Sequence, residues 1–200
     1  MATASARREE SGVLRSRLLP RLLGAERLEK LGTPHVLDFG RANADSLGYF
    51  SNHPCRLQVL DAAETLLPLA KRPRDADTPP AGVAEFDALF PELAGQRFDI
   101  VLLWDCINLL PVGDLPAFFR FLGEHLHDGC RGHGFILHKR TVEPRLRHFG
   151  ICAEDTLKLI AEQPLTLHLH NRKAINEAMD PLAIEHAVLH GDGRQEFLFR

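Results

Sequence analysis

The chain lacks the sequence features that mark several large protein classes. Its four cysteines include no C-x-x-C pair, and nothing resembling a secretory signal precedes them. Its longest apolar run, residues 100–104, is far shorter than the roughly 20 residues that cross a bilayer. We find no internal repeat and no low-complexity tract. These absences predict a cytoplasmic protein with reduced cysteines and no transmembrane segment.

The sequence also lacks a strong overall charge, although its charges are unevenly distributed. The net charge is -3, which gives no general reason to expect a nucleic-acid partner. Residues 1–30 nevertheless carry seven basic residues against four acidic ones, and residues 131–150 carry five against one. These two basic segments are candidates for attracting an anionic small molecule or a membrane surface. Ordinary solvated faces are the alternative interpretation.

What is present is the composition of one globular domain. The chain has 200 residues, 44% of them hydrophobic and 26% charged, which is enough to bury a substantial core. Leucines recur at three- and four-residue intervals over residues 13–31, which predicts an amphipathic helix broken at Pro20 into two short helices. We therefore expect an N-terminal helical extension over residues 1–32, followed by one domain over residues 33–200.

From residue 35 onward, short apolar runs alternate with helical patterns. Glycine and proline punctuate these patterns, and residues 71–82 are expected to be a loop. The predicted strands cover residues 35–40, 56–61, 98–105 and 134–138. The predicted helices cover residues 43–50, 62–70, 85–93 (interrupted at Pro91), a segment capped by Asp114 and stopped at Gly129, and residues 153–161.

The C-terminal part of the chain has a different pattern. Two strand-like runs, residues 184–190 and 195–200, flank a Gly-Asp-Gly link that is typical of a hairpin. The whole pattern predicts an α/β, Rossmann-like, mostly parallel sheet of seven or six strands. Helices cover both of its faces, and an antiparallel hairpin closes it. Ligands bind such sheets at the carboxyl ends of the strands.

The segment after the first of these strands has the residues of a nucleoside-binding turn. Gly40, Ala42 and Ala44 place small side chains at every second position, where a cofactor can approach the backbone closely. Asp61 follows the next strand, where a carboxylate can accept hydrogen bonds from both ribose hydroxyls. A dinucleotide would need a glycine at position 45, but Asp45 stands there and would repel a pyrophosphate. S-adenosylmethionine has no phosphate and carries a positive sulfonium, so the charges favour it.

Residues 36–44 resemble the first motif of class I S-adenosylmethionine-dependent methyltransferases, written D-x-G-x-G-x-G, with alanines at two of the glycine positions and Arg41 within the loop. Asp61 matches the ribose-binding acid of that superfamily. Residues 98–105 resemble its fourth strand, and the closing hairpin resembles its antiparallel sixth and seventh strands. We identify no third strand. The chain most resembles uncharacterised bacterial methyltransferase-like proteins that share W-D-x-x-N at residues 104–108 and Q-E-[FY]-L-F-R at residues 195–200.

The resemblance implies S-adenosylmethionine as cofactor and an acceptor that the sequence does not identify. The implied cofactor-binding residues are Asp38, Gly40, Ala42, Asn43, Ala44, Asp61, Trp104 and Asp105. Asp105 and Asn108 are the catalytic candidates, although Asp105 can equally be a strand-end residue that caps the following turn. No metal site is expected, because the eleven histidines form no complete ligand set. The alternative is a non-catalytic methyltransferase-like protein with a degenerate cofactor site.

Overall fold

The computed structural model describes residues 12–73, 78–138 and 145–200, and a six-stranded sheet is its centre. The first four strands in the order β3-β2-β4-β5-β9-β8 are mutually parallel, β9 runs antiparallel to β5, and β8 and β9 form the predicted hairpin. The strands are β2 (His35–Asp38), β3 (Arg56–Val59), β4 (Phe98–Trp104), β5 (Leu126–Leu137), β8 (Ile184–Leu189) and β9 (Arg194–Phe199).

The Rossmann-like α/β prediction is confirmed with six strands in this sheet. β3 is its edge, and within the described residues no further strand pairs with the outer side of β3. The predicted loop over residues 71–82 has no regular element up to the start of α5, although residues 74–77 lie outside the described part. The sequence analysis identified no third strand between residues 61 and 98, and the described residues of this segment form none.

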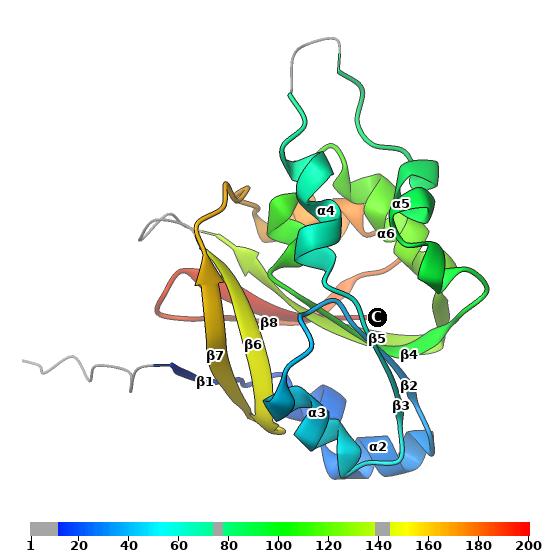
Figure 1. Cartoon of the computed structure of the whole chain (residues 1–200), viewed down its shortest axis with the longest axis vertical. Coiled ribbons are helices and arrows are strands. Elements are labelled where there is room, and N and C mark those ends of the chain that lie inside the picture. Colours follow the sequence, from blue (N-terminus) through cyan, green and yellow to red (C-terminus); the bar gives the residue numbers. More distant parts are fainter. Residues whose placement is uncertain (1–11, 74–77, 139–144) are drawn as a thin grey trace, which may run out of the picture.

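One face of the sheet is covered by helices (Figure 1). An aromatic cluster that includes Phe39, Phe86 and Phe118 fills the interface, and Phe39 meets Phe118 at 6.1 Å between ring centroids. The elements on this side are α4 (Ala62–Ala70), α5 (Val83–Leu89), η1 (Pro91–Leu93), η2 (Cys106–Leu109), α6 (Leu115–Glu124) and α7 (Arg172–Ala178).

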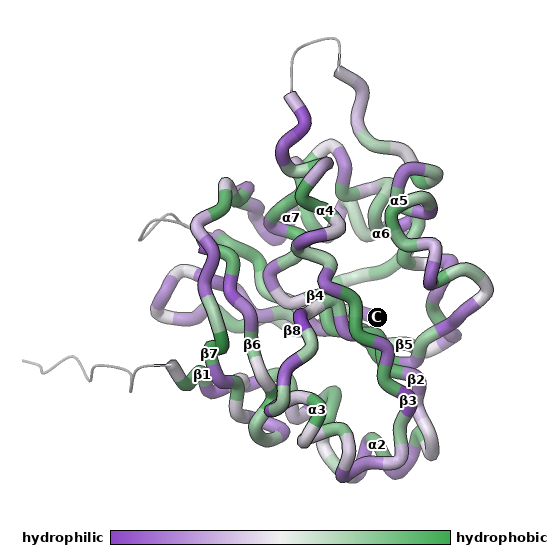
Figure 2. The backbone as a smooth tube through the Cα atoms, viewed as in Figure 1, coloured by the Kyte–Doolittle hydropathy of each residue, from purple (hydrophilic) through white to green (hydrophobic). Residues whose placement is uncertain are grey.

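The opposite face is covered by three helices and by a second sheet of order β1-β7-β6. Here Leu22 and Leu28 of the helices share a core with Ile100 of β4 and with Phe149 of β6. Figure 2 shows β6 and β7 alternating between hydrophilic and hydrophobic segments, as expected for a sheet with one buried face. These elements are β1 (Val13–Arg15), α1 (Pro20–Leu23), α2 (Ala25–Leu31), α3 (Ala44–Ser51), β6 (Leu146–Ala153) and β7 (Thr156–Gln163).

Two predictions about the N-terminal segment need correction. The amphipathic helix does not begin at residue 13, because residues 13–15 form β1 and pair with β7. Pro20 does not break a helix but starts α1. The first residues of a helix have no intrahelical acceptor for their N–H groups, so a proline costs no hydrogen bond there. Two short helices are present, but both follow Pro20 and the break between them is at Gly24, not at Pro20. The domain boundary at residue 32 stays a prediction, although the leucines of α1 and α2 pack on the main sheet.

Two further predictions fail in the second half of the chain. Residues 153–161 are not a helix but belong to the β6–β7 hairpin, and burial along β7 alternates with the period of a strand. Gly129 does not end the helix that follows Asp114. That helix ends at His125, and Gly129 lies within β5 with a φ of 77°, a backbone conformation that glycine adopts without strain.

Candidate functional site

The candidate site lies where β2, β3 and β4 end at the same edge of the sheet. Asp38 is the last residue of β2 and is in register with Val59 of β3 and Leu102 of β4. Asp61 follows β3 and accepts a hydrogen bond from the Glu64 backbone N–H at 3.4 Å, which caps α4. Parallel topology therefore brings the two predicted carboxylates to one edge.

Asp38 is buried and serves as an acceptor within the protein. The residue is only 2% exposed. Its Oδ1 accepts hydrogen bonds from Trp104 Nε1 at 2.5 Å and from the Gly40 backbone N–H at 2.7 Å. Burial raises the pKa of Asp38 to about 6, against the opposing effect of the two hydrogen bonds. Near neutral pH this carboxylate is ionised only at a substantial desolvation cost.

Trp104 explains why position 40 must be a glycine. A Cβ on Gly40 would lie 2.8 Å from Trp104 Nε1 and 2.8 Å from Asp38 Oδ1. Trp104 has a φ of 51°, and such a value in a bulky non-glycine residue marks local backbone strain of the kind found at functional sites. In this conformation the space beside Gly40 is taken by the indole of the protein itself.

Asp61 is paired with the arginine of the neighbouring loop. Arg41 Nε donates to Asp61 Oδ2 at 2.8 Å, and both side chains are partly exposed. The hydrogen bond to Asp61 raises the pKa of Arg41 further above its ordinary value. A ribose that used Asp61 as its acceptor would have to displace this guanidinium. Arg41 was noted in the sequence as an unusual residue, but its partner was not predicted.

The remaining loop residues have local roles. Asn43 caps α3, because its Oδ1 accepts from the Ser46 backbone N–H at 2.9 Å. Its Nδ2 donates to the Phe149 carbonyl of β6 at 3.2 Å, which ties the loop to the second sheet. Ala42 and Ala44 are exposed. The loop therefore touches β6 directly.

The two catalytic candidates are both buried and hydrogen-bonded. Asp105 is 1% exposed and pairs with Arg194 Nη2 at 3.1 Å, while the Arg147 backbone N–H donates to it at 3.1 Å. Burial raises the pKa of Asp105, and the charge of Arg194 opposes that shift. The side chain of Asp105 does not cap η2, so the turn-capping interpretation is wrong. Its catalytic role stays a prediction.

Asn108 connects η2 to the end of β5. Its Nδ2 donates to the Phe135 carbonyl at 2.9 Å, and its Oδ1 accepts from the Leu137 backbone N–H at 2.9 Å. The residue has no exposed surface. These contacts hold the carboxyl end of β5 beside β4, and a catalytic role for Asn108 stays a prediction.

The sequence analysis predicted no strand over the residues that form β6, which covers the site. The cavity between the loop and β6 has a volume of about 10 Å³, enough for about one water molecule. Its walls include Gly40, Trp104 and Asp105 on one side and His148 on the other. Among the described residues, His148 Nε2 is buried without a hydrogen-bond partner, and burial followed by the charge of Arg41 lowers its pKa.

These residues fit S-adenosylmethionine in chemistry but not in space. Carboxylates suit a ribose and a sulfonium, but ligand sites for molecules of this size usually enclose 300–1,000 Å³. The cofactor therefore does not fit this conformation, in which Trp104 and β6 occupy the space beside Gly40. The described residues include no group of three histidine, cysteine, aspartate or glutamate side chains that could hold a metal ion. Within the same residues no helix is long and apolar enough to cross a membrane.

Comparison with known proteins identifies the fold. No family model and no curated protein matches the chain. Among solved structures, an S-adenosylmethionine-dependent methyltransferase from Clostridium acetobutylicum ATCC 824 is 12% identical, with 89% of each chain covered and a TM-score of 0.53. Two weaker matches have TM-scores of 0.47. The magnesium protoporphyrin IX methyltransferase of Synechocystis PCC 6803 is 12% identical, and the match covers 87% of this chain and 74% of that one. An O-methyltransferase family protein from Burkholderia thailandensis is 14% identical, and the match covers 92% of this chain and 55% of that one. The chain has the Rossmann-like fold of class I S-adenosylmethionine-dependent methyltransferases, and at these identities the likeness concerns the fold alone.

Proposed function

We propose that the chain is an S-adenosylmethionine-dependent methyltransferase acting on an acceptor that is not yet identified. The observation that carries the proposal is the placement of Asp38, Gly40 and Asp61 at adjacent strand ends in a methyltransferase fold. In the proposed complex Asp61 accepts from the ribose, after Arg41 has been displaced. Asp38 and Gly40, with the small residues of the following loop, flank the methionine part.

The proposal assigns the far end of the site to the residues that follow β4. Trp104 and Asp105 lie beside the position of the methyl group, and Asp105 and Asn108 remain the catalytic candidates. Both basic segments favour a small anionic acceptor, and nothing in the sequence favours a nucleic acid. All four cysteines are free thiols, which supports a location in the cytoplasm.

A second candidate function rests on the closure of the site. The indole of Trp104 lies against Gly40, Arg41 pairs with Asp61, and only about 10 Å³ remains beside them. A non-catalytic protein that has kept the fold and filled the cofactor site would show the same features. The two candidates differ in whether the cofactor binds at all.

Titration calorimetry of the full chain with S-adenosylmethionine and S-adenosylhomocysteine separates the two candidates. We expect saturable binding that is about 5- to 150-fold weaker in Asp61→Ala, because a buried ribose hydroxyl without its acceptor costs roughly 1–3 kcal/mol. Arg41→Ala should bind more tightly than the wild type, since it removes the competing guanidinium. Asp87→Ala, which changes an exposed carboxylate of α5, serves as control.

Absence of binding by folded protein at millimolar cofactor would establish the non-catalytic candidate instead. Binding that is equal in the wild type and in Asp61→Ala would show that the cofactor lies elsewhere. Titration with NAD under the same conditions should give no heat, because Asp45 stands where a pyrophosphate would need a glycine.

A further inference from the structure

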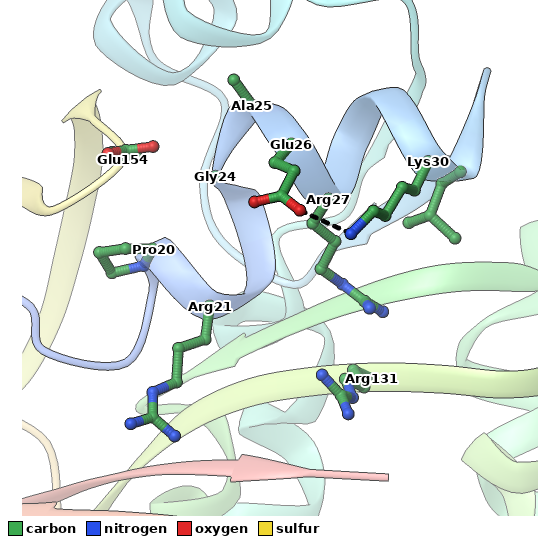
Figure 3. Close-up of a pocket in the computed structure, with 10 residues that line it drawn as sticks. Pro20, Arg21, Gly24, Ala25, Glu26, Arg27, Lys30, Arg131 and Glu154 are labelled. Carbon is green, nitrogen blue, oxygen red and sulfur yellow. Dashed lines mark hydrogen bonds and ion pairs between the residues drawn. The ribbon is translucent and has the colours of Figure 1, made fainter.

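A second pocket lies on the helical N-terminal side of the protein, away from the strand ends. It has a volume of about 560 Å³ and is lined by α1, α2, β5 and Glu154 in the turn between β6 and β7 (Figure 3). Its β5 residue, Arg131, is in register with Ile100, whereas Trp104 of the candidate site pairs with Gly134. The two levels are four residues apart along β4 and three along β5, or roughly 10–13 Å at about 3.3 Å per residue.

The two basic segments of the sequence meet in this pocket. Arg21, Arg27 and Lys30 come from the N-terminal segment, and Arg131 comes from the segment that begins at β5. Figure 3 shows the guanidinium groups of Arg27 and Arg131 on the same side of α2, with Arg21 farther along the groove. Two acidic residues, Glu26 and Glu154, also line the pocket, so its walls carry an excess of positive charge.

The cations of the pocket are only partly neutralised. Lys30 Nζ pairs with Glu26 at 2.6 Å, and Arg131 Nη2 pairs with Glu185 at 3.3 Å. Arg21 Nη1 contacts His186 Nε2 at 2.8 Å, and a neutral imidazole does not cancel the charge of the guanidinium. Among the described residues, neither Arg21 nor Arg27 forms an ion pair with a carboxylate. The walls of the pocket therefore retain cationic groups that an anion can pair with.

Arg27 is the most unusual of the four cations. Its Nε is buried and has no hydrogen-bond partner among the described residues. Burial lowers the pKa of Arg27, the like charge of Arg131 lowers it further, and Glu185 and Asp99 offset part of this effect. A buried donor without an acceptor is costly, and placing it near a second guanidinium adds repulsion. An anion at the guanidinium ends of the two side chains would relieve the repulsion between them.

We propose that this pocket binds a phosphorylated small molecule, with its phosphate group held between Arg27 and Arg131 and with Arg21 and Lys30 at the rim. Guanidinium groups match the oxygen geometry of an oxyanion through paired hydrogen bonds, which favours an oxyanion over a simple halide. The four cations of the walls favour the higher charge of a phosphate over a single carboxylate. The volume suits a ligand of metabolite size. The site does not depend on cofactor binding at the strand ends, so its test is independent of the proposed methyltransferase function.

The test is titration of the full chain with inorganic phosphate and with pyrophosphate at low ionic strength. We expect one saturable site that weakens as sodium chloride is added, because the contact is between charges. Arg27→Gln and Arg131→Gln should each weaken pyrophosphate binding at least tenfold. Arg120→Gln, on α6 at the opposite face of the sheet, should bind like the wild type. Failure of the wild type to saturate, or unchanged binding by Arg27→Gln, would overturn the proposal.

Thermal unfolding provides a readout that separates binding from folding. Without anion, the midpoint of Arg27→Gln should equal or exceed that of the wild type, because the variant removes a desolvated charge from beside Arg131. At the same concentration, pyrophosphate should raise the midpoint of the wild type more than that of the variant. Should Arg27→Gln fail to fold, the exposed Arg21→Gln replaces it, with binding expected to weaken about threefold. An equal pyrophosphate-induced rise in the wild type and in the variant used would contradict the assignment.

Discussion

At the scale of single residues, the carboxyl group of Asp38 determines much of the chemistry at the candidate site. It is buried, and one of its oxygens accepts both the Trp104 indole N–H and the Gly40 N–H. The sequence predicted the place of Asp38 and Asp61 because strand ends follow from hydrophobic runs. It did not predict that Trp104 and Arg41 are their partners, because such contacts depend on side-chain orientation across separate elements.

Asp38 should make stability fall as pH rises. Its pKa of about 6 in the folded protein lies above the ordinary 3.8, so the folded chain keeps a proton that the unfolded chain has released. Stability is then lost between about pH 4 and 6, by an amount on the order of 3 kcal/mol. In Asp38→Asn this loss should disappear, because an amide does not titrate in this pH range. The variant should still fold, since its amide oxygen can accept both hydrogen bonds. Urea unfolding of the two proteins from pH 4 to 7.5 measures the difference, and parallel curves would contradict the assignment.

At the scale of elements, β6 of the β6–β7 hairpin forms one wall of the candidate site. The hairpin was not predicted, because Leu157, Leu159 and Ala161 fit the spacing of a strand as well as that of a short helix. Only its pairing with β1 and its packing on α3 separate the two alternatives. Gly150 of β6 shows how close that packing is, since a Cβ there would lie 2.8 Å from Asn43 Oδ1 and 2.9 Å from Asp45 Cβ.

Gly150→Ala should therefore push β6 away from the start of α3. We expect a loss of about 1–3 kcal/mol in the free energy of unfolding, which is the usual range for overpacking. Backbone amides of β6 should exchange with deuterium faster, and S-adenosylmethionine should associate faster under the proposed function. Gly123→Ala, in α6 with open space around its Cβ, is the matched control and should be neutral or slightly stabilising. Unchanged exchange in β6 would show that the hairpin tolerates the methyl group.

At the scale of the whole molecule, Glu196 of β9 joins the N-terminal segment to the main sheet. Ser16 Oγ and the Arg17 backbone N–H donate to its carboxylate, as do His133 Nε2 and His190 Nε2, each at 2.9 Å. Burial acts to raise the pKa of Glu196, but the hydrogen bonds from the two histidines outweigh it, so the pKa lies well below its ordinary value. The resulting stabilisation is complete above about pH 4.5 and is lost as the pH falls.

Glu196→Gln should destabilise the whole fold. Removing one partner of a buried charged network typically costs about 3–5 kcal/mol. The single carbonyl oxygen of an amide cannot accept from all five donors, of which the Leu18 backbone N–H is the fifth. The loss should be largest near neutral pH and smaller at pH 4, as measured by urea unfolding. Glu177→Gln, which affects an exposed pair with Lys173, should cost less than about 1 kcal/mol. Equal losses in the two variants would show that Glu196 contributes only as a surface charge.

The overall architecture was largely predictable, since the parallel strands and the closing hairpin follow from local hydrophobic patterns. The second sheet was not, because β1 has three residues and pairs with a strand more than 140 positions away. Short strands stabilised only by distant partners leave little local signal.

The strand order has a consequence for how the protein forms during synthesis. β9 is translated after every other strand, but it lies inside the sheet between β5 and β8. Until β9 leaves the ribosome, the apolar edge of β5 has no neighbour and Ser16 has no acceptor at Glu196. A nascent chain therefore carries an open sheet edge from the completion of β5 at residue 137 until β9 is added, which is the kind of surface that chaperones shield.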